Sequence, residues 1–173
     1  MVKIGIVSDT HIISKDDPEK VNSLLDQLKK IFKDVDEIVH AGDVCNQFFL
    51  NALKDISPIK CVRGDEDEIK DLEAFIRFKI GNYNIGVIHE LPDNIESFVK
   101  EYRLHILIYG HTHAPIIKGT TYNTLILNPG SPTKPIAPPE VKGFKILVAR
   151  PSVLTLNIDE NNVITTFLIN LKL

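Results

Sequence analysis

Residues 2–11, which read Val2-Lys-Ile-Gly-Ile-Val-Ser-Asp-Thr-His11, decide the first step of the fold. An apolar run rich in β-branched residues stops at Ser8, which is the pattern of a strand buried in a sheet. A helix is expected next, because Asp17 can cap it and Pro18 suits its first position. Apolar residues recur at helical spacing as far as Phe32, so this helix has one face to bury.

The alternation of strand and helix continues along the chain. Residues 37–40 and 59–62 read as short apolar strands, and residues 47–53 between them read as a helix. The order β-α-β-α-β predicts a parallel sheet with helices packed against it. The acidic run at residues 65–71 is typical of a solvated helix start.

The second half of the chain reads mostly as strands. A hairpin is expected from residues 75–80 and 85–88 around a turn at 81–84, and a helix from residues 94–102. Four of the ten prolines, at positions 132, 135, 138 and 139, predict an exposed loop. The further strands that we expect are 105–109, 116–118 and 124–127, followed by a meander of 144–149, 153–158 and 163–171.

Length and charge restrict the class of protein. The 173 residues suit a single domain, residues 1–173, and the net charge of −3 provides no basic field for duplex nucleic acid. No run of about 18 apolar residues could span a membrane, and the N-terminus has no signal-peptide core. Cys45 and Cys61 have neither a metal-ligand spacing nor the number that a disulfide framework needs. We therefore expect a cytoplasmic protein without membrane or duplex partners.

Five short polar segments interrupt this scaffold, and each follows an expected strand. Ligands gather at the carboxyl ends of parallel strands, so these segments can converge. Within Asp9-Thr10-His11 and within Gly110-His111-Thr112-His113, the polar residues are two apart, which in an extended segment would point them the same way. The segments are Asp9-Thr10-His11, Gly42-Asp43, Gly64-Asp65, His89 and Gly110-His111-Thr112-His113.

The side chains in these segments are typical metal ligands. Four of the six histidines and three aspartates lie there. Imidazole combined with carboxylate suits manganese, iron, zinc, nickel or cobalt. Seven ligands exceed what one tetrahedral zinc ion needs, so the set predicts two divalent metal ions. A carboxylate can bridge two cations, and Asp43 is the natural bridge.

The order D-x-H, G-D, G-[ND], a lone histidine and G-H-T-H resembles the calcineurin-like metallophosphoesterase superfamily, and more narrowly its small YfcE-like phosphodiesterases. The resemblance runs from residue 2 to about residue 131 and includes Asn128-Pro-Gly-Ser131. It implies an α/β fold, a four-layer α-β-β-α sandwich of two mixed β-sheets flanked by helices. It also implies two metal groups that Asp43 bridges, with manganese the first choice of metal. One group would be Asp9, His11 and His113, and the other Asp65, His89 and His111.

The resemblance implies a metal-dependent phosphodiesterase or phosphatase. A hydroxide that bridges two metals would attack a small phosphodiester or phosphomonoester substrate. Arg63 could contact the phosphate, or it could form a salt bridge with the acidic residues 66–68. A homo-oligomer is left open.

Several residues depart from the family pattern. Asp65 stands where relatives usually have asparagine, Glu66 where many have histidine, and Glu90 where glycine is common. The added negative charge should weaken attraction for phosphate. Residues 62–65 also resemble the retromer subunit of the superfamily, so the alternative is a non-catalytic metal-binding scaffold for protein interactions. That subunit has lost the bridging aspartate, whereas this chain keeps Asp43.

Three further residues lie near the polar segments. His40 and His105 have no polar partner two residues away, so we interpret both as structural. Cys45 lies close to Asp43, but free cysteines are commonly buried and inert.

Overall fold

The computed structural model describes residues 1–143, 145 and 147–172, and its strands form two five-stranded mixed sheets. In the first sheet β1, β2 and β3 are parallel, whereas β9 runs antiparallel to β1 and β10 antiparallel to β9. The order across this sheet is β10 (Ile164–Asn170), β9 (Ser152–Ile158), β1 (Val2–Val7), β2 (Glu37–His40) and β3 (Ile59–Cys61).

The second sheet has its parallel strands in the middle. β5, β6 and β8 run parallel, and antiparallel strands close both edges. The edge strand β4 joins β5 in the expected hairpin, and β7 pairs antiparallel with β8. The order is β4 (Phe75–Ile80), β5 (Tyr83–Ile88), β6 (Ile106–Ile108), β8 (Leu125–Asn128) and β7 (Ile116–Gly119).

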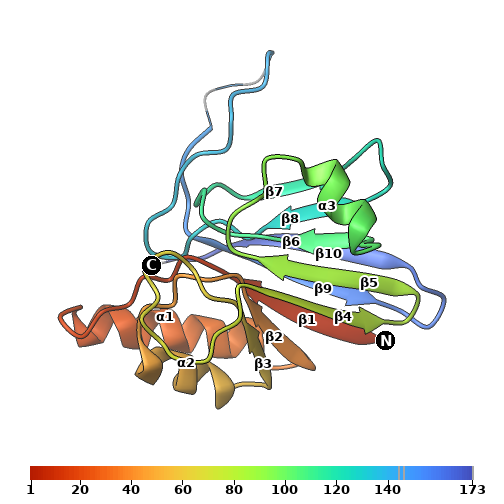
Figure 1. The fold of residues 1–173 in the computed structure, drawn as a ribbon. Helices are drawn as coiled ribbons and strands as arrows, with labels where there is room; N and C mark the ends of the chain where they lie inside the picture. The colour runs from red at the N-terminus through yellow and green to blue at the C-terminus, as the bar shows by residue number, and fades with distance from the viewer. Residues whose placement is uncertain (144, 146, 173) are drawn as a thin grey trace.

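Within the described residues, three helices cover the outer faces of the two sheets, and Figure 1 shows on which face each one lies. α1 (Pro18–Ile31) and α2 (Gln47–Lys54) pack on the first sheet, and α3 (Ile95–Glu101) packs on the second. Asp17 caps α1 by accepting from the backbone N–H of Glu19, and Leu24 and Leu28 are buried on its apolar face. Apolar residues of both sheets meet in a central core. The α-β-β-α sandwich is therefore confirmed.

Two local predictions were wrong. Residues 145 and 147–149 lie outside any strand, and residues 144 and 146 lie outside the described residues. β9 already pairs with β1 on one side and β10 on the other, so no strand edge beside it is left for this segment. The acidic run 65–71 forms turns and irregular backbone instead of a helix. The proline-rich segment is a loop as expected, and Figure 1 shows it leaving the body of the molecule.

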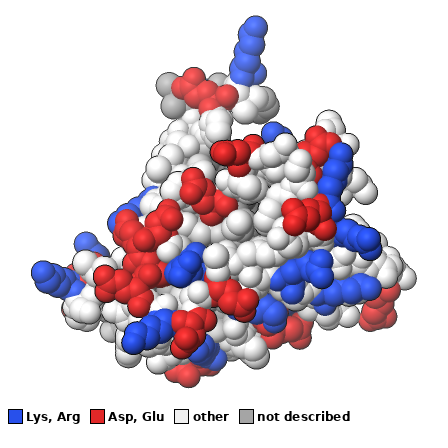
Figure 2. All heavy atoms as spheres, viewed as in Figure 1, with Lys and Arg blue, Asp and Glu red and all other residues white. Residues whose placement is uncertain are grey.

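Among the described residues on the face in Figure 2, acidic side chains gather left of the centre, and the basic side chains form no continuous band across the face. Within the described part of the chain, each helix is too short or too polar to cross a membrane.

Candidate metal centre

The structure brings all seven predicted ligands to one end of the two sheets. Each lies just beyond the carboxyl end of a strand that runs parallel to a neighbour, which is where the sequence placed them. Asp9 and His11 follow β1, Asp43 follows β2, Asp65 follows β3, His89 follows β5, and His111 and His113 follow β6.

The first group consists of Asp9, His11 and His113, whose candidate ligand atoms lie within 4.8 Å of one another. The Nε2 atoms of His11 and His113 are 3.1 Å apart, and His113 Nε2 lies 3.4 Å from Asp9 Oδ1. Asp9 is fully buried, and burial raises the pKa of its carboxyl group. Its charge therefore needs a nearby cation.

The second group consists of Asp65, His89 and His111, again within 4.8 Å. Asp65 Oδ2 lies 3.0 Å from His111 Nδ1 and 3.6 Å from His89 Nε2. This group is more open than the first, because the side chains of Asp65 and His111 are 60% and 42% exposed. The open side gives a ligand from solvent access to the group.

Asp43 lies between the two groups. Its Oδ2 atom is 3.6 Å from His11 Nε2 and 3.3 Å from His89 Nε2, so one oxygen faces both. Its Oδ1 atom accepts a hydrogen bond of 2.8 Å from the backbone N–H of Glu66. Burial opposes the charged carboxylate, but these contacts outweigh it and lower the pKa of Asp43 to about 2. Burial likewise opposes charge on His89, yet Asp43 and the Ala41 carbonyl raise its pKa to about 9.

Three of the histidines have their ring orientation set by a second contact. His11 Nδ1 lies 3.0 Å from Glu66 Oε2, His113 Nδ1 2.8 Å from the Lys134 carbonyl, and His89 Nδ1 2.8 Å from the Ala41 carbonyl. Carbonyl and carboxylate oxygens accept, so each Nδ1 donates and each Nε2 points into the centre.

These orientations require positive charge in the centre. Two imidazole lone pairs 3.1 Å apart repel each other unless a proton or a metal ion lies between them. Within the described part of the chain, the buried atoms Asp9 Oδ2 and His89 Nε2 have no hydrogen-bond partner. The donor set therefore fits divalent metal ions, although its role as their ligand set remains a prediction.

Five of the seven residues have left-handed backbone, which residues with a Cβ rarely adopt. The sequence predicted that residues two apart would point the same way because these segments are extended. That reason was wrong, because the segments are not extended. The side chains still converge, and backbone strain of this kind gathers at functional sites. The φ values are +53° for Asp9, +45° for His11, +57° for Asp43, +64° for His111 and +56° for His113.

Hydrogen bonds hold these strained segments in place. The N–H groups of Asp9 and His11 donate to the carbonyls of Gly42 and Asp43 at 3.0 and 2.9 Å. Residues 128–131, which belong to the family resemblance, also contact these segments: Ser131 Oγ donates to the Asp9 carbonyl at 2.7 Å. Asn128 Nδ2 donates to the Gly110 carbonyl at 2.8 Å.

Two glycines allow the strands' ends to approach. A Cβ atom on Gly64 would overlap the backbone and carboxylate of Asp43. A Cβ atom on Gly110 would overlap Ser8 Oγ and lie 2.8 Å from the Ala41 carbonyl oxygen. No side chain fits at either position without moving the ligands or the backbone beside them.

Sequence reasoning missed Asp67. Its Oδ2 atom accepts from the N–H groups of Asp43 and Gly64 at 2.9 and 2.8 Å, and its Oδ1 atom accepts from Cys45 at 2.7 Å. One carboxylate thus joins the loops after β2 and β3. The signal was an acidic residue two positions beyond Asp65, and it was mistaken for part of a solvated helix start.

The other candidate residues are placed as follows. Arg63 is exposed, and no ion pair joins it to residues 66–68 in the described part of the chain, so that alternative is not supported. His105 accepts from the N–H of Asn84 at 2.9 Å, which confirms a structural role. His40 is fully buried and contacts Thr10 Oγ1 at 3.1 Å. Burial raises the pKa of Cys45 to about 12, so its thiol stays protonated.

Two known proteins are similar to this chain in sequence. A probable metallophosphoesterase from Methanothermobacter thermautotrophicus is 32% identical over 164 residues, which cover 90% of this chain and 86% of that protein. A second probable metallophosphoesterase, from Methanocaldococcus jannaschii, is 35% identical over 141 residues, or 78% and 70% of the two chains.

Solved structures match nearly the whole chain at lower identity. A predicted phosphoesterase from Streptococcus pneumoniae has a TM-score of 0.72 at 19% identity, covering 98% of this chain and 89% of that one. Vps29 from Entamoeba histolytica, complexed with Zn²⁺, has a TM-score of 0.71 at 22% identity, covering 98% and 99%. A structure described as a novel archaeal phosphodiesterase has a TM-score of 0.69 at 20% identity, covering 97% and 100%.

The calcineurin-like phosphoesterase superfamily domain matches residues 2–150, which include every residue of the two metal groups and Asp43. This match agrees with the two metallophosphoesterase relatives and with the two-sheet fold. The chain therefore belongs to the calcineurin-like phosphoesterase superfamily.

Proposed function

We propose that this protein is a metal-dependent phosphodiesterase or phosphatase that hydrolyses small phosphoesters at a centre of two divalent cations. The observation that carries the proposal is Asp43 Oδ2, which faces His11 in one group and His89 in the other at 3.6 and 3.3 Å. A single carboxylate in that position can serve both groups. The metal ions would supply a Lewis acid for the phosphoryl oxygens and an activated water as nucleophile.

The protein's own residues would position the metal ions and neutralise most of their charge. Asp9, His11 and His113 would hold one cation, Asp65, His89 and His111 the other, and Asp43 would bridge them. Three aspartates bring a charge of −3 against +4 from two divalent ions, so little positive charge remains for phosphate. Within the described residues that surround the two groups, we identify no dedicated general acid. Esters with good leaving groups, such as aryl phosphodiesters, should therefore react fastest.

The remaining proposals follow from the donor set and the sequence. Manganese is our first choice of metal, with nickel, zinc, iron and cobalt as alternatives, because mixed imidazole and carboxylate ligands suit all of them. We also propose that residues 1–173 form one domain and that the protein acts in the cytoplasm.

The test is hydrolysis of bis-p-nitrophenyl phosphate. Protein stripped of metal is resupplied with Mn²⁺, Ni²⁺, Zn²⁺ or Mg²⁺, and the Asp43→Ala variant is compared with Asp93→Ala, which removes an exposed carboxylate that is not among the predicted ligands. Metal-dependent turnover that Asp43→Ala loses and Asp93→Ala keeps would support the proposal. Turnover that is equal without metal, or equal in Asp43→Ala, would contradict it.

A second candidate is a non-catalytic scaffold that binds metal. The exposed carboxylates of Asp65, Glu66 and Glu90 near the histidines favour it, because they add negative charge where phosphate would bind. Tight binding of two metals without turnover of the diester would move this candidate to first place. Asp65→Asn separates the two: for an enzyme limited by this charge it should raise kcat/KM several-fold, and for a scaffold it should produce no turnover.

A further inference from the structure

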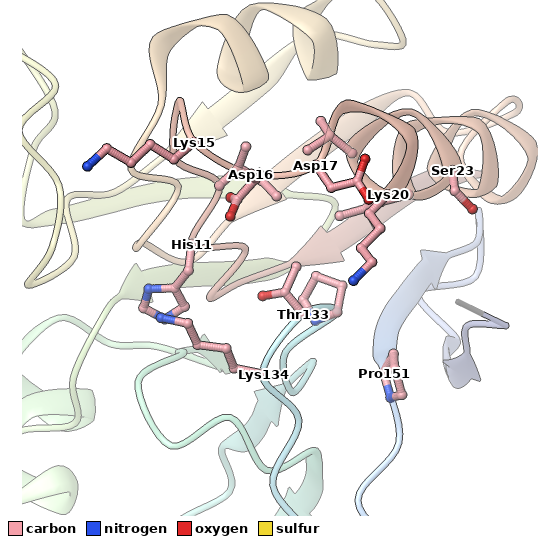
Figure 3. A pocket seen from close by; sticks show the side chains of 13 residues that line it. His11, Lys15, Asp16, Asp17, Lys20, Ser23, Thr133, Lys134 and Pro151 are labelled. Carbon is pink, nitrogen blue, oxygen red and sulfur yellow. The ribbon is translucent and has the colours of Figure 1, made fainter.

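A cavity of about 660 Å³ opens beside His11 and lies outside the two metal groups. It lies between the start of α1, residues 132–134 and Pro151, as Figure 3 shows. His11 is the one residue that the cavity shares with the predicted ligands. Its size is in the usual range for pockets that bind small molecules.

One wall of the cavity is apolar. The residues of this wall are Ile12, Val21, Leu24, Pro132 and Pro151, of which Ile12 and Leu24 are buried. Such a surface favours contact with the flat or apolar part of an organic molecule over contact with water. A phosphoester held at the metal centre would extend its alcohol part toward this wall, because His11 belongs to both.

The polar side of the cavity has amino groups without partners. No ion pair engages Lys20 or Lys134 within the described part of the chain. In Figure 3, Lys20 hangs from α1 into the cavity, Lys134 reaches toward His11, and Lys15 points away from both. Asp16 and Asp17 also line the cavity, but each accepts a backbone N–H, from Ile13 at 2.7 Å and Glu19 at 3.0 Å.

The backbone of Lys134 is fixed to the metal centre. Its carbonyl accepts from His113 Nδ1 at 2.8 Å, and its N–H donates to Ser131 Oγ at 2.9 Å. The next turn is held as well, because the N–H of Ile136 donates to the His113 carbonyl at 3.1 Å. These hydrogen bonds therefore hold the backbone of Lys134, from which its side chain extends, between the first metal group and the cavity.

We propose that this cavity binds the alcohol part of the substrate and that Lys20 and Lys134 bind a second anionic group on it. The inference rests on the proposed function, because the phosphate to be cleaved must sit beside His11. The substrate class is a phosphoester whose alcohol carries an apolar ring and a further phosphate or carboxylate. A lysine amino group binds such an anion as a point charge, and its contribution falls as salt rises.

The test compares two nucleotides as probes, adenosine 3′,5′-bisphosphate and adenosine 5′-monophosphate. Their affinities for the Mn²⁺-loaded protein are measured by calorimetry at low salt, and the recovered ligand is checked for hydrolysis. We expect the bisphosphate to bind about tenfold more tightly, as one added charged contact can provide. The advantage should fall below about threefold in the double variant Lys20→Gln/Lys134→Gln and remain in Lys29→Gln, which changes an exposed lysine at the other end of α1.

Equal affinity of the two probes for the unchanged protein would overturn the inference. An advantage that persists in the double variant would overturn it too. Because the readout is binding, its failure can be told apart from failure of the proposed function. Protein that hydrolyses bis-p-nitrophenyl phosphate but shows no lysine-dependent advantage would support the proposed function and contradict the binding pocket. Protein with the advantage but no hydrolysis keeps an anion-binding pocket and loses the function.

Discussion

Replacing Glu66 with alanine should weaken metal binding at the group of Asp9, His11 and His113. Glu66 Oε2 accepts from His11 Nδ1 at 3.0 Å, which fixes the ring so that Nε2 points into the centre. Losing such a contact typically lowers metal affinity 10- to 100-fold. The Glu66 side chain is 60% exposed, so water screens it, and we expect the lower end of that range, about tenfold or roughly 1.4 kcal/mol.

Graded variants make this prediction sharper. Glu66→Gln keeps an acceptor but removes the charge, so its metal affinity should lie between those of the unchanged protein and Glu66→Ala. Glu68→Ala, which removes an exposed carboxylate two residues away, is the matched control. Zn²⁺ titration against a competing chelator resolves the two binding events. Equal affinities for the unchanged protein and Glu66→Ala, or an equal loss in Glu68→Ala, would refute the reasoning.

Three further predictions concern stability. Gly110→Ala should lower the unfolding free energy by roughly 2 kcal/mol or more, because the added Cβ would overlap the Ala41 carbonyl oxygen. Gly119→Ala, whose Cβ would contact nothing, should change it little. Thermal melts of the two variants test this. Asp67→Asn should cost about 1–3 kcal/mol in denaturant titrations, since at least one of the three part-buried N–H groups that donate to Asp67 loses its acceptor. Unchanged stability would contradict this. Burial lowers the pKa of His40 to about 4, below its value of about 6.5 in the unfolded chain, so as the pH falls the unfolded chain takes up the proton first. The stability of the metal-free protein should therefore fall from pH 6.5 toward pH 4, by at most roughly 3 kcal/mol. His40→Gln should flatten that slope.

Much of the scaffold could be predicted because local pattern and tertiary structure agree. The apolar run before Ser8 forms β1, and the cap at Asp17 starts α1 where expected. The expected strand at 144–149 shows the limit of such reasoning. Its apolar residues suit a strand, but whether a strand forms depends on a free sheet edge, and pairing of β9 with β1 and β10 is not visible in the local sequence.

The candidate site divides in the same way. The seven predicted ligands could be found because each follows a strand and carries a ligand-type side chain. The partners that orient them could not be found, because Glu66 is 55 residues from His11 and meets it only in the folded chain. Glu66 had been interpreted as a loss of positive charge near phosphate. Its contact with His11 adds an orienting role that composition and spacing do not contain.

The backbone conformation of the centre lowers the stability of the folded protein. Five predicted ligands have left-handed φ angles, and each such residue costs about 1–3 kcal/mol. Hydrogen bonds from Ser131 and Asn128 and the carboxylate of Asp67 hold these segments, so the donor set is assembled by the protein itself. The Nε2 atoms of His11 and His113 are then held 3.1 Å apart, where their lone pairs repel. A cation relieves that repulsion, so a preformed, strained site should bind metal tightly with little rearrangement of the backbone.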